Sequence, residues 1–379
     1  MRRMSTVLNN RPEKIHALTS LRFFAAFYVV LFHTLPLVFF NEISGTALQR
    51  AVSLGFVSVS FFFLLSGYIL AMVYLRNGAE VKKRSFYAAR FARVYPLFFV
   101  TLLLDTPFVL LSRAHQYGWN DAVARTGATF GAHVLMLQAW LPGIRGIDQP
   151  NWSLSVETVF YLIFPFLGLM LWRLRGWQLW VVATALWISS QIAVALVAPH
   201  VLLTTAKFHP LLHVCTFALG ILVARWQFLQ REKSGSSPKN GISIAIALIV
   251  AVAGFAMVVQ WGAALPVPNL NAGLLSPIIA LVIWACSGSR SLPARLLSAK
   301  WLVVLGEASF GLYLIQMPVL HLFEALHWEH SRPLYPVYLA ICIGLSVLSF
   351  YFLETPTRKW ILRRLQTRPK ETMEAASDA

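Results

Sequence analysis

An arginine and a histidine in the first apolar segment have residue types and a spacing suited to chemistry. Arg22 and His33 are eleven residues apart in the stretch LTSLRFFAAFYVVLFH. On a helix, this spacing brings both side chains to within roughly 20° of one face, about 16 Å apart along the axis. Histidine can exchange a proton near neutral pH or carry an acyl group transiently, which makes His33 a candidate catalytic residue with Arg22 beside it. An anchoring arginine and a histidine bonded to a neighbouring helix would explain the pattern equally well.

A second basic pair, Arg90 and Arg93, lies three residues apart directly before another apolar segment. Side chains at this spacing are neighbours on a helix surface, and paired guanidinium groups can bind phosphate oxygens bidentately. Coenzyme A offers such phosphates from the cytoplasm, so Arg90, Arg93 and Arg22 are candidate ligands of an acyl-CoA co-substrate. Anchoring of the span, or binding of anionic lipid headgroups, is the alternative.

A third group of polar residues opens a span in the sequence NWSLSVE, after Pro150. Ser153 can cap the helix, and the helix dipole favours a carboxylate such as Glu157 near its start. The indole of Trp152 suits a membrane interface, and it could also orient a sugar. We predict that Trp152, Ser153 and Glu157 bind an acceptor at the outer mouth of the bundle, with Glu157 also contributing to catalysis.

Small residues mark two further stretches, Ser66-Gly67 and the segment that begins at Gly306, where they predict close helix packing. Glu307 and Gln316 in the second stretch are candidates for the bundle interior. The sequence contains no Walker loop, GxGxxG, HExxH or GxSxG motif, and its three cysteines show no metal-ligand spacing. We therefore expect no metal site and no permanently bound cofactor.

The elements that position these residues are transmembrane helices. The 379-residue chain is 58% hydrophobic and 12% charged, and its charged share is about half that of a soluble domain. Segments such as 51–75 and 241–265 contain no charged residue, and about 20 helical residues cross the hydrocarbon core. The sequence predicts an all-α fold, a polytopic transmembrane helical bundle.

The apolar segments predict about ten spanning helices and one short additional segment at 128–141. The expected spans are 17–40, 51–75, 94–112, 152–172, 177–198, 207–228, 241–264, 272–288, 301–326 and 335–353. A full crossing by 128–141 would invert every later loop, so this segment is predicted to be re-entrant or interfacial. The expected organisation is a cytoplasmic tail at 1–16, a transmembrane domain at 17–353 and a second cytoplasmic tail at 354–379.

The net charge of +17 is concentrated in alternate loops between the spans. This distribution follows the positive-inside rule and argues against nucleic acid as a partner. It predicts that both termini lie in the cytoplasm.

Taken together and in order, these motifs resemble those of the membrane-bound acyltransferase-3 family. The resemblance rests on LTSLRFFAAFYVVLFH, FFFLLSGYIL, RFARVYP, NWSLSVETVFYLIFP, GEASFGLYLIQMP and FLETP, and covers roughly 15–356. It implies transfer of an acyl group, commonly acetyl, from cytoplasmic acyl-CoA to a hydroxyl of a cell-envelope glycan or glycolipid. His33 and Arg22 match the family's essential histidine and its basic partner, and Arg90 and Arg93 match its paired arginines. Gln316 departs from the family, which often has histidine there.

Two other classes of protein fit parts of this pattern. Ionisable residues within spans also suit a proton-coupled transporter or flippase for an envelope glycan or lipid. No inverted repeat or pair of broken helices supports that class. A structural membrane subunit would leave the ordered motifs without an explanation.

Overall fold

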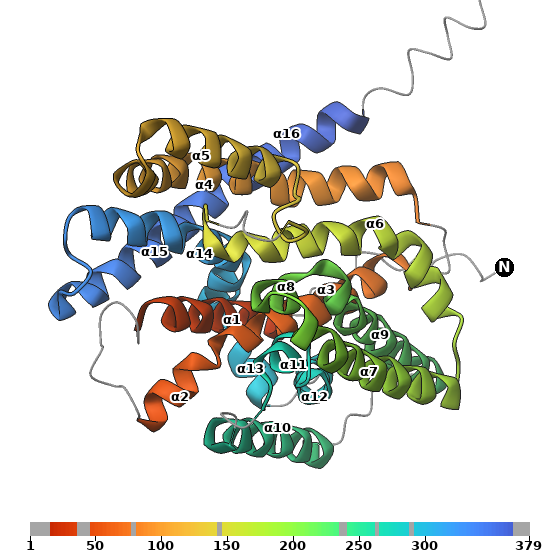
Figure 1. Cartoon of the computed structure of the whole chain (residues 1–379). Coiled ribbons are helices and arrows are strands. Elements are labelled where there is room, and N and C mark those ends of the chain that lie inside the picture. Colours follow the sequence, from red (N-terminus) through yellow and green to blue (C-terminus); the bar gives the residue numbers. More distant parts are fainter. Residues whose placement is uncertain are drawn as a thin grey trace, which may run out of the picture.

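The computed structural model describes residues 16–35, 46–76, 81–141, 146–234, 241–261, 265–287 and 292–366, which form helices and turns without a strand (Figure 1). The α-helices are α1 (His16–Thr34), α2 (Ala47–Ser53), α3 (Ser58–Tyr74), α4 (Lys83–Tyr117), α5 (Trp119–Val134), α6 (Trp152–Trp172), α7 (Trp177–Val197), α8 (Leu203–Phe208), α9 (Val214–Ser234), α10 (Gly241–Trp261), α11 (Val267–Asn271), α12 (Ser276–Cys286), α13 (Leu292–Leu297), α14 (Lys300–Ala325), α15 (Tyr335–Ser349) and α16 (Thr355–Gln366). The predicted all-α class is confirmed. The predicted tail at 1–16 falls almost entirely outside the described residues, whereas the predicted tail at 354–379 is described as far as residue 366 and begins with α16.

Ten helical segments of the described chain are long and apolar enough to cross a membrane, which confirms the predicted polytopic bundle. The short segment predicted at 128–141 has different bounds, because the helix there is α5, Trp119–Val134. It is followed by a turn in which Met136 adopts a positive φ of 56°. The helix begins early because polar residues alternate with apolar ones in its first turns, and hydropathy alone does not detect such an amphipathic helix. α5 is not among the ten candidate spans.

Two helices extend beyond their predicted ends. α4 begins at Lys83 instead of 94 and has 35 residues, which makes it about 50 Å long and longer than the hydrocarbon core. Arg90 and Arg93 therefore lie on the same continuous helix as the apolar span. The last span continues from α15 through a π-helical turn, Phe350–Glu354, into α16. Such π turns often occur at functional sites.

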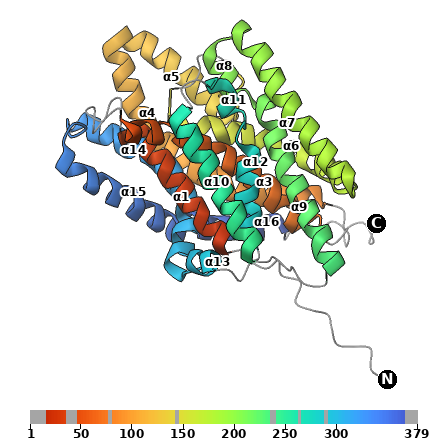
Figure 2. The same cartoon turned by 90° about the horizontal axis from the view of Figure 1, so that it is seen from below.

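The most extensive helix contacts join α3 to α9 and α1 to α14. Gly67 and Gly220 make the first contact possible, since a Cβ on either would collide with a backbone carbonyl of the other helix, at Phe217 or Leu64 respectively. Gly306 has the same role between α14 and α1. The packing predicted for both small-residue stretches is confirmed. α12 packs against α3 and α9 in this bundle, and α10 lies on α12 (Figure 2).

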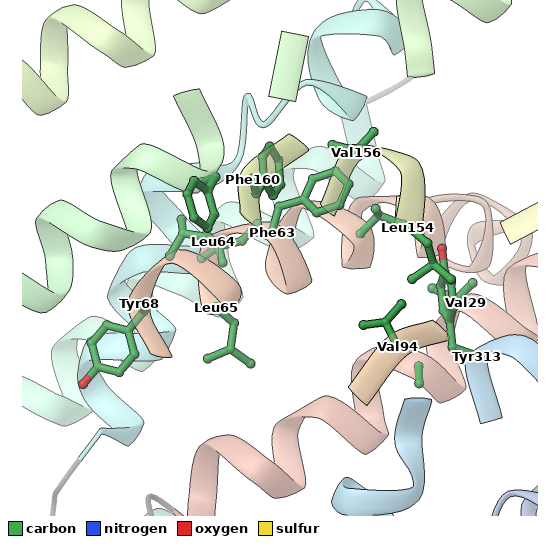
Figure 3. Close-up of a cluster of buried hydrophobic side chains, with 14 of the residues drawn as sticks. Val29, Phe63, Leu64, Leu65, Tyr68, Val94, Leu154, Val156, Phe160 and Tyr313 are labelled. Carbon is green, nitrogen blue, oxygen red and sulfur yellow. The ribbon is translucent and has the colours of Figure 1, made fainter. Parts of the chain in front are cut away.

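An aromatic core fixes the first turns of α6. Phe63 of α3 meets Phe160 of α6 edge to face at 5.1 Å between ring centroids, and Phe160 stacks on Phe217 of α9 at 4.5 Å. Figure 3 shows Phe63 beside Phe160, with Tyr313 farther along the same cluster. Aromatic pairs with these geometries contribute about 0.5–1.5 kcal/mol each, in addition to the effect of burying their surface. The core thereby holds the helix that carries Trp152 against α3 and α9.

Candidate active site

Arg22 and His33 lie on the face of α1 that packs against protein. Both side chains are half-buried, whereas Phe24 on another face is 45% exposed. α1 runs along α14, where a Cβ on Gly306 would collide with the backbone of Thr19. This close approach fixes the helix that carries both predicted residues.

The imidazole of His33 contacts the side chain of Gln316. Nδ1 of His33 lies 3.2 Å from Oε1 of Gln316, and Nε2 of Gln316 donates to the carbonyl oxygen of Tyr313 at 2.8 Å. The second bond fixes the orientation of the amide, so its oxygen faces the ring and Nδ1 of neutral His33 carries the hydrogen. Nε2 of His33 then keeps its lone pair, as a general base or nucleophile requires.

A cavity of about 530 Å³ lies beside His33, within the size range of small-molecule sites. His33, Trp152 and Lys207 all line this cavity. Its aromatic walls are formed by Phe32, Phe56, Trp152, Phe208 and Tyr313. The structure therefore brings two predicted site residues, His33 and Trp152, to one cavity, although they are far apart in the sequence.

Ser153 lies behind the wall of this cavity and supports it. Its hydroxyl donates to the carbonyl oxygen of Pro150 at 2.9 Å and lies 2.9 Å from the hydroxyl of Tyr313. Tyr313 donates to the same carbonyl oxygen at 3.0 Å. Ser153 is thus placed to position Tyr313, which lines the cavity, and is itself 5% exposed.

Glu157 faces a different part of the bundle from Trp152. Its Oε1 accepts hydrogen bonds from the hydroxyls of Ser66 at 3.3 Å and Tyr161 at 2.5 Å. The carboxylate also lies within electrostatic range of Arg22. Five residues along a helix correspond to a rotation of about 140° from one face. The structure therefore places Trp152 in the cavity lining and Glu157 beside Ser66 and Tyr161, and the role of Glu157 in binding an acceptor stays a prediction.

Arg22 belongs to a cluster of charged side chains at the other end of the site from the cavity. The cluster brings together α1, α4, α6, α14 and the π-helical turn. Groups that interact electrostatically with Arg22 are Arg93, Glu157, Glu307 and Glu354. We call these five residues the arginine–carboxylate cluster. In a low-dielectric interior, the three carboxylates attract the two guanidinium groups and help to hold them in place.

Arg90 lies next to this cluster, among tyrosines. It donates to the hydroxyl of Tyr74 at 3.5 Å. Its guanidinium carbon is 5.8 Å from the ring centroids of both Tyr74 and Tyr161, within cation–π range. Since Tyr161 also donates to Glu157, the structure brings Arg22, Arg90 and Arg93 into one region, as the donor-site prediction requires.

Sequence reasoning missed several polar residues of these two regions. Glu354 enters the arginine–carboxylate cluster from the π-helical turn, and Arg358 of α16 interacts electrostatically with Arg90 and Arg93. Glu354 and Arg358 directly follow the last predicted span, 335–353. Charged residues are common at the end of a span, so their positions alone did not indicate a site. Lys207 belongs to α8, a helix too short to stand out by periodicity.

A buried acidic group supports the loop next to the cavity. Asp105 of α4 accepts from the backbone N–H of Asp148 at 2.6 Å and pairs with Nδ1 of His321 at 2.5 Å. Burial and the nearby Asp105 carboxylate raise the pKa of Asp148, which favours its neutral form. Asp148 immediately precedes the turn Gln149–Asn151, so this group helps to place Pro150 in the cavity wall.

Among the described residues, no group of three or more His, Cys, Asp and Glu side chains is arranged to hold a metal ion. The polar groups instead form two regions of different chemistry, linked by α1 and α14. One contains guanidinium groups suited to phosphates, and the other contains the imidazole of His33 at the wall of a cavity.

Comparison with known proteins gives this arrangement a family. The model of a protein family described as "Acyltransferase domain" matches residues 15–354 of this chain. The acyltransferase MdmB of Streptomyces mycarofaciens is 33% identical over 82% of this chain and 80% of its own length. Nodulation protein 10 of Rhizobium leguminosarum bv. viciae is 25% identical over 79% of this chain and 82% of its own.

A third relative is longer than this chain. The O-acetyltransferase OatA of Staphylococcus aureus is 23% identical over 96% of this chain, and the match spans only 60% of OatA. No solved structure shows significant similarity to this chain. The match over nearly the whole bundle, together with the ten apolar helices, shows that the chain belongs to the acyltransferase-3 family of membrane-bound acyltransferases.

Proposed function

We propose that this protein transfers an acyl group, with acetyl as the expected group, from cytoplasmic acyl-CoA to a hydroxyl of a cell-envelope glycan or glycolipid. The observation that carries the proposal is the bond between His33 and Gln316, which leaves one imidazole nitrogen available in a cavity. The name of OatA, an O-acetyltransferase, supports acetyl as the group and oxygen as its acceptor. Acyl-CoA acts as a co-substrate, and no permanently bound cofactor is required.

The proposed site lies in the bacterial inner membrane, with both chain termini in the cytoplasm. The described residues contain ten candidate spans, and an even number of crossings supports two chain ends on the same side. The basic residues before α4 belong to that side by the positive-inside rule. The donor then approaches the arginine–carboxylate cluster from the cytoplasm, and the acceptor approaches the cavity from the outside.

In the proposed reaction, Arg22, Arg90 and Arg93 bind the phosphates of the donor, and its thioester extends toward His33. Nε2 of His33 takes the proton of the acceptor hydroxyl as its oxygen attacks the thioester carbonyl. A C–O bond forms, the C–S bond breaks, and the thiolate of coenzyme A recovers the proton from His33. A transient acyl-histidine is the alternative route and uses the same nitrogen.

The remaining predicted site residues have separate roles in this scheme. Trp152 contributes an aromatic wall to the acceptor cavity, and Ser153 acts through Tyr313. Glu157 acts on the donor side, where it holds the arginines in place.

The proposal is tested with inside-out membrane vesicles that contain the protein. Labelled acetyl-CoA is supplied outside the vesicles, and label is measured in the glycan and glycolipid fractions. The proposal expects incorporation that depends on the protein. Movement of an unmodified glycan or lipid across the membrane without incorporation would instead favour the transporter.

Replacement of Arg93 by glutamine is expected to raise the KM for acetyl-CoA about tenfold, with a smaller change in kcat. The substitution removes a guanidinium from the proposed phosphate site, and a hydrogen bond to a charged group contributes about 1.5–3 kcal/mol. Initial rates of acetyl transfer at varied acetyl-CoA concentration measure the effect. The matched control is Arg84→Gln, an exposed arginine on the same helix. Equal KM values for both variants would exclude Arg93 from the donor site.

Replacement of Gln316 by leucine is expected to lower kcat about ten- to hundredfold and to leave the KM for acetyl-CoA nearly unchanged. Leucine has similar volume but cannot accept the Nδ1 hydrogen, so His33 is no longer held in one tautomer. Gln316→His restores an acceptor and is expected to recover part of the rate. Steady-state rates of the three proteins decide the matter, and a leucine variant with wild-type kcat would show that Gln316 does not position His33.

A further inference from the structure

Arg358 of α16 extends the group of arginines that α4 carries. α16 packs against α4, and Arg358 lies one helical turn beyond Glu354. Glu354 in turn interacts electrostatically with Arg93 and Arg22, which belong to the arginine–carboxylate cluster. The side chain of Arg358 is exposed, whereas those of Arg90 and Arg93 are half-buried. Arg358 is therefore the most exposed arginine of this group.

The charges around Arg358 are mostly of its own sign. The groups that act most strongly on its guanidinium are, in order of strength, Arg93, Arg90 and the carboxylate of Glu307. Like charges that lie close together repel one another, and the repulsion is stronger near low-dielectric protein than in bulk water. An anion bound among these guanidinium groups would replace repulsion by attraction. Such a group of arginines is suited to a ligand with several phosphates.

Arg90 retains hydrogen-bond donors for such a ligand. A guanidinium carries five N–H donors. One terminal nitrogen of Arg90 donates to the hydroxyl of Tyr74 over a long distance of 3.5 Å. Its Nε makes no hydrogen bond to any residue that the structure describes. Because a donor without an acceptor is costly away from water, Arg90 and its neighbour Arg358 are arranged for an acceptor that comes from outside the chain.

The order of the arginines in the bundle matches the order of the groups in coenzyme A. The diphosphate of coenzyme A lies between the thiol-bearing arm and the nucleoside, and the 3′-phosphate lies on the ribose at the far end. In the proposed reaction, the thioester extends toward His33, which shares α1 with Arg22. The ribose phosphate then lies farthest from His33, on the side where Arg358 is exposed.

We propose that Arg358, together with Arg90, binds the 3′-phosphate of coenzyme A, while Arg22 and Arg93 bind its diphosphate. The inference rests on the proposed function, because it assigns the phosphates of the proposed donor to particular arginines. Arg358 then makes the protein selective for coenzyme A over 3′-dephospho-coenzyme A. The helix that follows the last span thereby becomes part of the donor site.

The inference is tested by direct binding, without acyl transfer. The full-length protein is placed in phosphatidylcholine nanodiscs, and binding of labelled coenzyme A and labelled 3′-dephospho-coenzyme A is measured against empty nanodiscs. The test variant is Arg358→Gln. The matched control is Lys359→Gln, which removes the same charge from the next position of the same helix, where the side chain is also exposed.

Wild-type protein is expected to bind coenzyme A more tightly than its 3′-dephospho form. Arg358→Gln is expected to raise the Kd of coenzyme A about tenfold, since a hydrogen bond to a charged group is lost, and to leave the Kd of the 3′-dephospho form within about twofold. Lys359→Gln is expected to leave both Kd values near those of the wild type.

Three results would overturn the inference. They are an unchanged Kd of coenzyme A in Arg358→Gln, an equal rise for both ligands in that variant, and the same loss of selectivity in Lys359→Gln. Acetyl transfer by a protein in which Arg358→Gln keeps full selectivity would contradict this inference alone. Selective binding that depends on Arg358, in a protein that transfers no acetyl group, would contradict the proposed function alone.

Discussion

Replacement of His33 by alanine is expected to lower acyl transfer by about 10²–10⁴-fold, the usual contribution of a general acid–base residue. The substitution removes the imidazole that lies between Gln316 and the cavity. Either proposed route, proton transfer or transient acylation, requires this ring. Transfer of label from acetyl-CoA to the acceptor fraction measures the loss.

The variant is expected to fold and insert normally, because His33 is only half-buried and α1 remains packed on α14. Size-exclusion profiles and thermal unfolding of the purified protein check this. Phe24→Ala is the control on the same helix, since Phe24 is 45% exposed and points away from the site. Wild-type transfer by the alanine variant would end the proposed mechanism.

Replacement of Gly220 by valine is expected to lower the free energy of unfolding by about 3 kcal/mol or more, with loss of folded protein from the membrane. A Cβ at Gly220 would collide with the carbonyl oxygen of Leu64 and approach the backbone nitrogen of Tyr68 at 2.9 Å. Backbone atoms cannot rotate away as side chains can, so α3 and α9 must separate. That separation also disrupts the aromatic core at Phe63.

The matched control is Gly344→Val, in α15. Nothing lies within 4 Å of a Cβ placed at Gly344, so the same change of residue meets no neighbour there. Thermal unfolding in detergent and the yield of membrane-inserted protein compare the two variants. Equal stability of both variants would show that the α3–α9 contact can adapt to a side chain.

The number of spans and the inward face of α1 were predictable, because both follow from short-range periodicity. About 20 apolar residues define a span whatever the rest of the chain does. Similarly, the spacing of Arg22 and His33 determines that they share a face. The bounds of α4 were not predictable from hydropathy, since its first turns contain charged residues that form a helix equally well.

The partners of each site residue depend on contacts between distant parts of the chain, which one sequence does not reveal. Gln316 meets His33 across 283 positions, and no local pattern links them. Glu157 was expected beside Trp152 because the two are close in sequence, yet the turn of the helix separates them. Lys207 was one basic residue among 32, and only the folded chain distinguishes it.

The close packing of α1 on α14 has a consequence for how the site responds to motion. Glu307 and Gln316 are both carried by α14, the first within range of Arg22 and the second in contact with His33. Sliding of α14 along α1 as a rigid body would shift both pairings by the same distance. Any ligand or substitution that alters the register of these two helices would therefore change the Arg22–Glu307 and His33–Gln316 pairings simultaneously. A substitution that changes only one of the two pairings must act through a side chain.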